Sequence, residues 1–296
     1  MFSAAITGEI GSGKSTLAKI WDRMGANVID LDAVAKNQWR LPGIMEAATR
    51  RWGRDTYPGG KPDFRRLASR MFSSAEDYHF AISLIHPGTM AEAARMVHNL
   101  NGWVVLEIPL LFETGWFDLI DCVVCVTATN DLRIKCAASR GWNESEFSVR
   151  ERFMIDSSKK QDMSDIVMRN AGSLETWEER GRELGAILRK ISTVHELSVF
   201  CKDKDEARAI MSALIGERLV AGANVKKIES MFHWREEIVE APEYIVHSFT
   251  VESNIRNAMR RIREIHSYEL PVITAREVRR SDFRALKWVV DNCGGV

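Results

Sequence analysis

The chain has 296 residues, 45% of them hydrophobic and 28% charged, which is enough for two domains and excludes an intrinsically disordered polymer. Its 41 lysine and arginine residues balance its 41 aspartate and glutamate residues, so we expect no nucleic-acid partner. Because no apolar run approaches the ~18 residues that span a bilayer and the five cysteines lack the spacing of a disulfide framework, we expect no membrane partner and a cytoplasmic location.

The first half of the chain alternates strand and helix patterns, which predicts an α/β fold with a doubly wound parallel sheet. Its later apolar runs are continuous, as is typical of strands covered on both faces. Cys122 and Cys125 lie three positions apart in the last run and would point to opposite faces of a strand, so we expect a core role for them. The predicted elements are a strand at 2–7, a helix over 17–24, a strand at 27–30, a helical stretch over 33–101 with a turn at 57–60, and strands at 103–108 and 122–127.

The second half of the chain has a different pattern, which begins after a charged helix predicted over 174–191. Its elements follow the order strand, helix, strand, strand, helix, strand, the order of the α+β ferredoxin-like fold. We therefore predict two domains, residues 1–192 and residues 193–296. The predicted elements of the second domain are strands at 196–201, 224–232, 243–250 and 271–278, with helices over 207–219 and 255–263 and a terminal helix that ends near 292.

The glycine-rich loop from Gly8 to Ser15 reads GEIGSGKS and fits the pattern G-x-x-x-x-G-K-S/T. Successive backbone N–H groups of such a loop surround phosphate oxygens, and the following helix directs its positive end to the same place. Lys14 would reach the β and γ phosphates, and the Ser15 hydroxyl would coordinate Mg²⁺. The residues predicted to bind nucleotide here are Gly8, Gly11, Ser12, Gly13, Lys14, Ser15 and Thr16.

Two aspartates, Asp30 and Asp32, follow the second predicted strand. With a period of two they would project to the same side, towards the crevice where open α/β sheets bind ligands. There they would orient an attacking hydroxyl, accept its proton, or hold Mg²⁺ through water. The alternative for Asp32 is a helix N-cap, because it directly precedes Ala33.

Further short motifs accompany the loop in a fixed order along the chain. They are Thr7-Gly8, Asp30-Leu31-Asp32, Ile85-His86-Pro87, the run from Glu107 to Glu113, Arg140-Gly141 and Asn170-Ala171-Gly172. Together they resemble the dephospho-coenzyme A kinase family over about residues 2–191.

That resemblance implies ATP-dependent phosphorylation of the ribose 3′-hydroxyl of dephospho-coenzyme A, with Mg²⁺, by a core that carries a helical substrate-binding insert and a mobile lid. In this scheme Asp32 is the base or the group that orients the hydroxyl, and Arg140 on the lid neutralises charge on the transferring phosphoryl group. His86 would face the substrate, with a buried histidine at a helix end as the alternative. The remaining implied site residues are Lys14 for catalysis, Asn170 for the nucleotide, and Asp30, Glu107 and Leu110 for the substrate.

Three positions depart from the family's pattern. Cys136 stands where the family often has an arginine, and Arg133 on the same predicted helical face is a candidate substitute. Met154 aligns with a common glutamine, and Glu9 stands in place of the usual second glycine of the loop. A carboxylate beside phosphates is unfavourable unless it points to solvent, so Glu9 raises a question about efficiency.

Two other functions stay open at this point. One is a different P-loop kinase that acts on a nucleotide or another small alcohol. The other is a nucleotide-binding regulatory or metal-tolerance protein with a degenerate kinase half. Steady-state turnover separates these functions, because a sensor binds ATP without consuming it.

The second predicted domain carries its own set of motifs. They are the runs 217–224 (ERLVAGAN), 230–234 (SMFHW) and 265–271 (IHSYELP), together with Trp288. These resemble the CutA divalent-cation tolerance family over about residues 197–292. The resemblance implies a ferredoxin-like fold that forms a tight homotrimer through strand pairing between subunits, and an association with copper.

A metal site in this domain has limited support from the residues themselves. Gly222 stands where the family has a cysteine, which removes the soft ligand suited to copper. His233, His247 and His266 are candidate ligands without a short ligand spacing, and His266 is the one retained as a possible metal ligand. Hydrogen-bonded histidines are the favoured alternative, so we expect this domain to act chiefly in oligomerisation and regulation.

Overall fold

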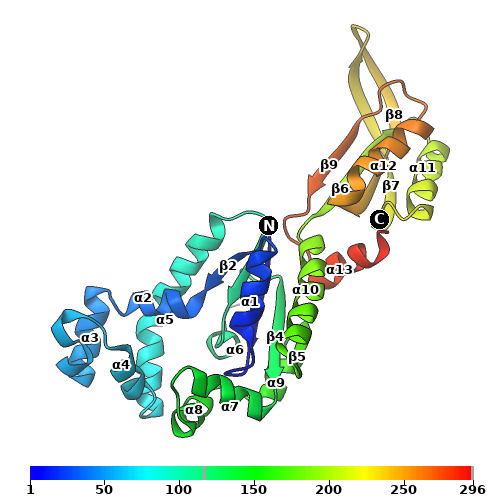
Figure 1. The fold of residues 1–296 in the computed structure, drawn as a ribbon. Coiled ribbons are helices and arrows are strands. Elements are labelled where there is room, and N and C mark those ends of the chain that lie inside the picture. Colours follow the sequence, from blue (N-terminus) through cyan, green and yellow to red (C-terminus); the bar gives the residue numbers. More distant parts are fainter. Residues whose placement is uncertain (116–117, 295–296) are drawn as a thin grey trace. The chain divides into compact units, whose positions relative to one another are not determined.

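The computed structural model describes residues 1–115 and 118–294 (Figure 1). They form two compact units, an N-terminal unit of Ser3–Gly185 and a C-terminal unit of Met1–Phe2 with Ala186–Val296. The domain boundary predicted between residues 192 and 193 stays a prediction. Within the described ranges, no helix combines the length and the apolar content that crossing a membrane requires.

A five-stranded sheet with the order β2-β3-β1-β4-β5 forms the centre of the N-terminal unit. β1 pairs in parallel with β4, β4 with β5, and β2 with β3, which confirms the predicted parallel sheet. Every residue of β1 and β3 is buried, and this explains why both strands have continuous apolar sequences. Cys122 and Cys125 are buried free thiols of β4, as expected for a core role. The strands span Phe2–Gly8 (β1), Asn27–Asp30 (β2), Trp103–Glu107 (β3), Cys122–Ala128 (β4) and Ile166–Asn170 (β5).

Helix α1 (Lys14–Arg23) packs closely against helix α10 (Leu174–Ile191). The Trp21 side chain is fully buried, and its indole N–H donates a hydrogen bond of 2.8 Å to the Gly181 carbonyl oxygen. A Cβ atom at Gly181 would lie 3.0 Å from Ile20 and 3.1 Å from Leu17, so the glycine permits the close approach. This packing fixes the helix that begins at the glycine-rich loop.

A helical segment follows β2 and has a core of its own. This core contains Trp39, Trp52 and Tyr57, and the tyrosine hydroxyl donates to the Trp39 carbonyl. The predicted turn near residues 57–60 is present as two short 3₁₀ helices, Arg54–Thr56 and Pro58–Gly60. The helices are α2 (Leu31–Gln38), α3 (Pro42–Trp52), α4 (Phe64–Met71) and α5 (Ala75–His98).

Short helices connect the later strands of the sheet and contact the helical segment. Phe153 stacks on Tyr78 of α5 with ring centroids 4.6 Å apart, and it also contacts Phe72. The Arg150 guanidinium lies over the Trp142 ring and the Phe72 ring. These helices are α6 (Leu111–Thr114), α7 (Asn130–Ser139), α8 (Glu144–Glu151) and α9 (Ser157–Asp162).

The C-terminal unit contains an antiparallel sheet with the order β7-β8-β6-β9. Its element order of strand, helix, strand, strand, helix, strand confirms the predicted ferredoxin-like fold. Buried aliphatic residues of β6, α11 and α12 form its core. The elements are β6 (Val194–Cys201), α11 (Lys204–Gly216), β7 (Gly222–Trp234), β8 (Glu237–Val251), α12 (Glu252–Ile265), β9 (Ile273–Glu277) and α13 (Phe283–Asn292).

The hairpin of β7 and β8 is longer than the sequence predicts. Arg235 and Glu236 both have positive φ values, 47° and 68°, and form the two-residue turn. The Asn-Gly sequence that is usual for such a turn is missing here, so the predicted strands do not extend to the turn. β6 pairs with β8 only from Val251 to Tyr244, so the outer part of the hairpin is a two-stranded ribbon (Figure 1).

The packing of α1 against α10 predicts different costs for two leucine truncations. Leu17→Ala should lower the free energy of unfolding by about 2–5 kcal/mol, because Leu17 is fully buried and its loss leaves a cavity. Leu174→Ala on α10 is the matched control, since its side chain is 65% exposed, and it should change stability by less than ~0.5 kcal/mol. Urea unfolding followed by tryptophan fluorescence measures both, and equal effects would contradict the packing described.

Candidate active site

The glycine-rich loop lies between the end of β1 and the start of α1, at the C-terminal edge of the sheet. Gly8 has φ 128°, and a Cβ atom there would lie 2.0 Å from the Val126 carbonyl oxygen of β4. Gly13, the N-cap of α1, has φ 102°, and a Cβ atom there would lie 2.6 Å from the Asn170 amide nitrogen. Only glycine fits either position, so the backbone at both ends of the loop is set by its neighbours.

Lys14 is buried and closes the loop from within. Its Nζ donates to the carbonyl oxygens of Gly8, at 3.2 Å, and Glu9, at 2.7 Å. Burial lowers the pKa of Lys14 to about 8, although the negative charges of Glu107 and Asp32 act in the opposite direction. The ammonium group is therefore incompletely compensated, and an anionic ligand would stabilise its charged form.

Ser15 and Glu107 meet beside the loop. The Ser15 hydroxyl donates a 2.7 Å hydrogen bond to Oε1 of Glu107, the last residue of β3. Glu107 is in register with Asp30 of β2, and its pKa is raised mainly by burial. Hydroxyl and carboxylate oxygens are the hard ligands that Mg²⁺ prefers, so this pair fits a magnesium ion next to bound phosphates.

Asp30 and Asp32 differ from the sequence prediction in their local structure. The strand ends at Asp30, whose side chain accepts a 3.1 Å hydrogen bond from the Ala33 N–H and caps α2. Asp32 belongs to the first turn of α2, so the expected strand alternation does not extend to it, and the alternative that Asp32 is the N-cap is wrong. The pKa of Asp32 is raised, first by crowding that removes water from its carboxyl group and then by the charge of Asp30.

Arg140 and Asn170 approach the loop from two other elements. Arg140 ends α7, and its charge acts on both Lys14 and Asp32. Asn170, the last residue of β5, donates a 2.9 Å hydrogen bond from its amide to the Ser12 carbonyl oxygen. The structure therefore brings both predicted residues into the electrostatic or hydrogen-bonded surroundings of the loop.

The other loop residues are held by the backbone. The Thr16 N–H donates to the Gly13 carbonyl oxygen in the first turn of α1. The Ser12 hydroxyl is buried and lacks a hydrogen-bond partner among the described residues, and the Gly11 backbone has φ 74°. A buried polar atom without a partner in a phosphate loop is consistent with a site that is completed by its ligand.

His86 and Leu110 lie further from the loop in sequence. His86 is half-buried in the middle of α5, before Pro87, so the alternative of a histidine at a helix end is wrong. Its Nε2 is buried without a partner in the described part of the chain, and burial lowers its pKa. Leu110 is half-buried, precedes α6, and its carbonyl accepts from the Thr114 hydroxyl.

Lys160 is a site residue that the sequence did not reveal. It lies on α9 and is almost completely buried, with Nζ 3.0 Å from the Pro109 carbonyl oxygen and 2.7 Å from Oε1 of Glu113. Its charge also lowers the pKa of Lys14. In the sequence Lys160 is one lysine among other charged residues, and nothing in its local pattern indicates burial. Its partner Glu113, at the end of the motif from Glu107 to Glu113, was the one sequence feature that pointed to this region.

Glu9 and Arg133 depart from what the sequence suggested. The Glu9 side chain is only 14% exposed and pairs with Arg133 at 3.3 Å. It therefore does not point to solvent, and its charge is balanced by an arginine. The hypothesis that Arg133 substitutes for the missing lid arginine is wrong, because Arg133 is buried and donates to the Ile10 carbonyl oxygen. Cys136 remains half-exposed on the same helix.

In the C-terminal unit, His266 is held by hydrogen bonds. Its Nε2 lies 2.8 Å from the Phe200 carbonyl oxygen, and its Nδ1 accepts from the Tyr268 N–H at 3.0 Å. Cys201 and Glu206 are near enough for all three ligand atoms to lie within 4.8 Å of one another. Burial raises the pKa of Cys201 to about 12, which keeps the thiol protonated, so the residues present favour the hydrogen-bonded alternative.

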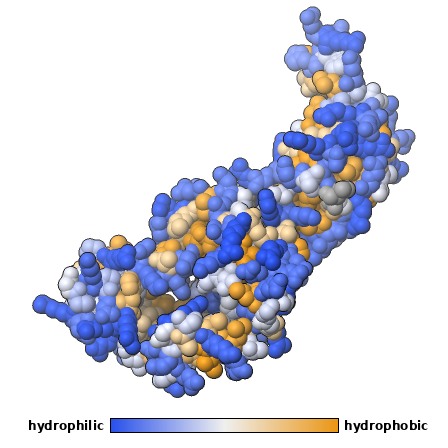
Figure 2. Space-filling view, viewed as in Figure 1, coloured by the Kyte–Doolittle hydropathy of each residue, from blue (hydrophilic) through white to orange (hydrophobic). Residues whose placement is uncertain are grey.

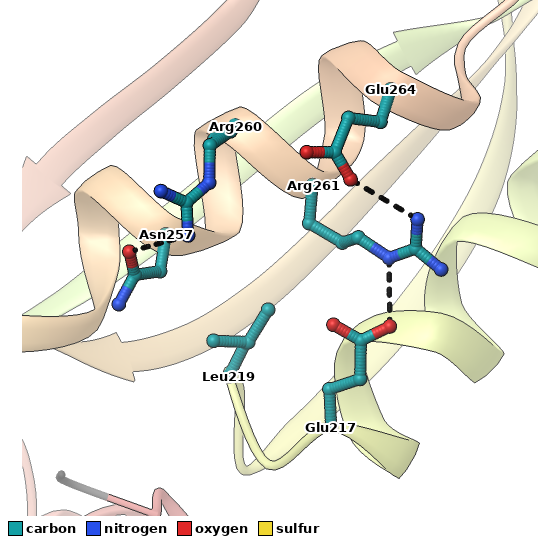
Figure 3. Close-up of a pocket in the computed structure, with 6 residues that line it drawn as sticks. All are labelled: Glu217, Leu219, Asn257, Arg260, Arg261 and Glu264. Atoms are coloured by element: carbon teal, nitrogen blue, oxygen red, sulfur yellow. Dashed lines mark hydrogen bonds and ion pairs between the residues drawn. The ribbon is translucent and has the colours of Figure 1, made fainter.

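A depression in the C-terminal unit lies between α12 and the end of α11 (Figure 3). Arg261 donates from Nε to Glu217 at 2.7 Å and from Nη1 to Glu264 at 3.2 Å. Because carboxylates flank this guanidinium on both sides, the depression offers little net positive charge to an anion. The phosphate-binding loop lies in the N-terminal unit.

Comparisons with known proteins agree with this division. Residues 2–176 match the family model described as dephospho-CoA kinase, and residues 196–292 match the model of the CutA1 divalent ion tolerance protein. The dephospho-CoA kinase of Corynebacterium diphtheriae is 36% identical over 187 residues, which are 60% of this chain and 93% of that protein. A dephospho-CoA kinase of Thermus thermophilus is 35% identical over 192 residues, 63% of this chain and 90% of that protein.

Solved structures match the two units separately. The crystal structure of TT1252 from Thermus thermophilus is 33% identical, covers 63% of this chain and 96% of its own, and has a TM-score of 0.53. The divalent cation tolerance protein CutA1 from Thermus thermophilus is 26% identical over 34% of this chain and 99% of its own, with a TM-score of 0.33. Both resemblances stated from the sequence are confirmed by the family models. The chain belongs to the dephospho-CoA kinase family and carries, after the kinase region, a second region that matches CutA1.

Proposed function

We propose that this chain transfers the γ-phosphoryl group of ATP to the ribose 3′-hydroxyl of dephospho-coenzyme A. The observation that carries the proposal is the meeting of Lys14, the Ser15–Glu107 pair and Asp32 at one edge of the sheet. That group supplies a phosphate-binding cation, oxygen ligands for a metal ion and a carboxylate of raised pKa, the three components that phosphoryl transfer to an alcohol requires. A different P-loop kinase has less support, because the relatives from Corynebacterium diphtheriae and Thermus thermophilus are dephospho-CoA kinases that match over 90% or more of their length.

The loop and Lys14 bind and position the nucleotide. Backbone N–H groups from residues 11 to 16 and the positive end of α1 receive the phosphate oxygens. Lys14, already anchored by two loop carbonyls, places its charge beside the β and γ phosphates. Ser15 and Glu107 would hold Mg²⁺, which when bound neutralises phosphate charge.

Asp32 is the residue that we assign to the acceptor hydroxyl. Its side chain is exposed in the first turn of α2, within electrostatic reach of Lys14 and Arg140, and the upward direction of its pKa shift suits a general base at neutral pH. It would accept a hydrogen bond from the 3′-hydroxyl and then its proton as the oxygen attacks phosphorus. Arg140, exposed at the end of α7, would neutralise the charge that develops on the transferring group.

The acceptor has a place to enter beside the helical segment. Figure 2 shows a hollow in the surface of the N-terminal unit between α5 and the α7–α8 segment. His86 lies on α5 with a buried Nε2 that lacks a described partner, and we assign it with Asp30 and Leu110 to binding of dephospho-coenzyme A. Glu107 was expected at the substrate as well, but its bond to Ser15 favours the metal side of the site.

The C-terminal unit is proposed to join three copies of the chain. The outer part of the β7–β8 hairpin pairs with no third strand of the described unit, and a two-stranded ribbon is marginally stable by itself. A groove of about 820 Å³ runs along it, and two of its lining residues, Met231 and Leu270, are 65% and 71% exposed. Ile238 of the same hairpin is 64% exposed. Figure 2 shows hydrophobic side chains below the hydrophilic tip of this hairpin. The number three comes from the resemblance to the CutA family.

Two finer assignments remain part of the proposal. A divalent metal such as copper near His266 stays a prediction, and it has less support than the hydrogen-bonded alternative because both ring nitrogens already have partners. A cytoplasmic location also stays a prediction and accords with five free cysteines. The regulatory alternative, a degenerate kinase half that only senses nucleotide, loses one argument because Glu9 is neutralised by Arg133.

Replacing Asp32 tests the kinase assignment directly. Asp32→Asn should lower kcat with dephospho-coenzyme A by about 10²–10⁴-fold, because the amide cannot accept the proton, while ATP still binds. Asp22→Asn on the exposed face of α1 is the matched control and should keep full turnover. Lys14→Ala should instead lose most ATP affinity. A folded wild-type chain that binds ATP but does not phosphorylate dephospho-coenzyme A would refute the proposed function and favour the sensor.

The lowered pKa of Lys14 predicts a proton uptake on ATP binding. In the free chain Lys14 is protonated below pH 8 and increasingly neutral above it, whereas bound phosphates favour the charged form. ATP binding at about pH 9 should therefore be several-fold weaker than at about pH 7 and should take up protons. Titration calorimetry in buffers of different ionisation enthalpy measures both. Lys14→Arg, which does not titrate in this range, should bind without this uptake; equal uptake by the two proteins would assign it to another group.

Assembly through the hairpin groove is tested by sedimentation equilibrium of the full chain. Wild type should have a mass about three times 33.6 kDa. Met231→Asp should give monomers, because a charge buried between copies is costly whereas the same residue is 65% exposed in one copy. Arg208→Glu on the exposed face of α11 is the control and should leave the mass unchanged. A wild-type monomer at micromolar concentration would end this part of the proposal.

A further inference from the structure

Glu9 is the residue of the phosphate loop whose chemistry is least expected there, and both oxygens of its carboxylate have partners in the structure. Its Oε2 accepts a 2.9 Å hydrogen bond from the Ala128 N–H at the end of β4. Its Oε1 lies 3.3 Å from Nη1 of Arg133, and the two side chains are only 14% and 7% exposed. Its carbonyl oxygen accepts from Lys14. Glu9 thus has a fixed position under the loop and does not extend into the space for phosphate.

Arg133 contacts three consecutive residues of the loop. Besides pairing with Glu9, its Nε donates a 3.0 Å hydrogen bond to the Ile10 carbonyl oxygen. Its own backbone lies against Gly11, where a Cβ atom would be 2.6 Å from the Arg133 carbonyl oxygen. One residue of α7 therefore supports the backbone of residues 9 to 11 from below.

Arg133 is itself held in place from the opposite side. Its Nη1 donates to the Asn130 side chain at 3.0 Å, and its Nη2 pairs with Glu151 at the end of α8. The guanidinium also lies over the Phe147 ring of α8, 5.3 Å from the ring centroid. Because Nε, Nη1 and Nη2 of Arg133 all have partners, the guanidinium has little freedom to turn away from Glu9.

The electrostatic consequence concerns the nucleotide. An uncompensated carboxylate buried next to the loop would repel triphosphate, and this repulsion is strong where water is scarce. Arg133, which also pairs with Glu151, offsets that charge at contact distance, and Lys14 is the cation that we assign to the phosphates. The pair therefore reconciles a carboxylate in the loop with an anionic ligand.

We propose that Arg133 is a positioning residue for nucleotide binding, which acts by neutralising Glu9 and by supporting the backbone of loop residues 9 to 11. The proposal rests on the proposed function only in that the loop binds ATP. It assigns to Arg133 no contact with the acceptor or with the transferring phosphoryl group. Its effect should therefore be on the affinity for ATP and not on kcat at saturating ATP or on the KM for dephospho-coenzyme A.

A double-mutant cycle on the full-length chain tests this, with the Kd for MgATP measured by titration calorimetry without acceptor. Arg133→Ala should weaken ATP binding at least ~10-fold, because Glu9 is left buried and unpaired. Glu9→Gln, which keeps an acceptor for the Ala128 N–H, should change the Kd by less than ~3-fold in wild type. In the Arg133→Ala background the same Glu9→Gln change should restore most of the lost affinity. Lys135→Ala removes an exposed charge from the same helix and should leave the Kd unchanged.

The outcomes separate this inference from the proposed function. Equal effects of Glu9→Gln in both backgrounds, or an unchanged Kd in Arg133→Ala, would overturn the inference while the kinase assignment stood. If Arg133→Ala is too unstable to titrate, Arg133→Gln replaces it in the same cycle with the same expected rescue. A cycle that behaves as expected in a chain that does not phosphorylate dephospho-coenzyme A would support the inference and refute only the proposed function.

Discussion

The burial of a single ammonium group organises the N-terminal unit. Lys14 lies under the loop, bonded to the carbonyl oxygens of Gly8 and Glu9, and its charge is only partly balanced by the carboxylates around it. A buried cation of this kind carries an unfavourable desolvation free energy until an anion pairs with it. The site is therefore predisposed to bind phosphate. The glycines of the loop, the packing of α1 on α10 and the register of β2 with β3 all serve to keep that cation in place.

The surrounding charges are arranged as two layers. On the open side, Asp32 and Arg140 act on Lys14 across the space where phosphate and acceptor would meet. On the protein side, Glu9 is paired with Arg133, which also binds Glu151, and Glu113 is paired with Lys160. Buried pairs of this kind contribute little to stability by themselves. Their value is geometric, because the Glu9–Arg133 pair joins the phosphate loop to α7 and the Glu113–Lys160 pair joins α6 to α9.

The sequence was sufficient to predict the fold and the residue types of the candidate site. It was less informative about helix caps, long-range side-chain contacts and the hairpin turn. Continuous apolar runs suffice to place β1, β3 and β4, because a strand that is buried on both faces has apolar residues at nearly every position. The sequence could not show that Asp30, and not Asp32, is the N-cap of α2. Both residues are aspartates, which are equally good N-caps, and the position of the cap depends on where β2 ends. The roles of Arg133 and Lys160 depend on contacts between distant segments, which no local pattern records. The hairpin turn at Arg235-Glu236 uses residues that rarely adopt positive φ, so turn statistics missed it.

The long ribbon of β7 and β8 has a consequence for how the chain folds. Its outer strands have hydrogen bonds to each other and apolar side chains that one copy leaves in water. In the assembly proposed here, those side chains become buried only when copies meet, so ordering of the outer hairpin is coupled to association and obeys mass action. Dilution should then loosen the outer hairpin, while the rest of the C-terminal unit, with its own buried core, remains folded. The cellular abundance of the chain would thereby set the fraction of molecules in which the outer hairpin is ordered.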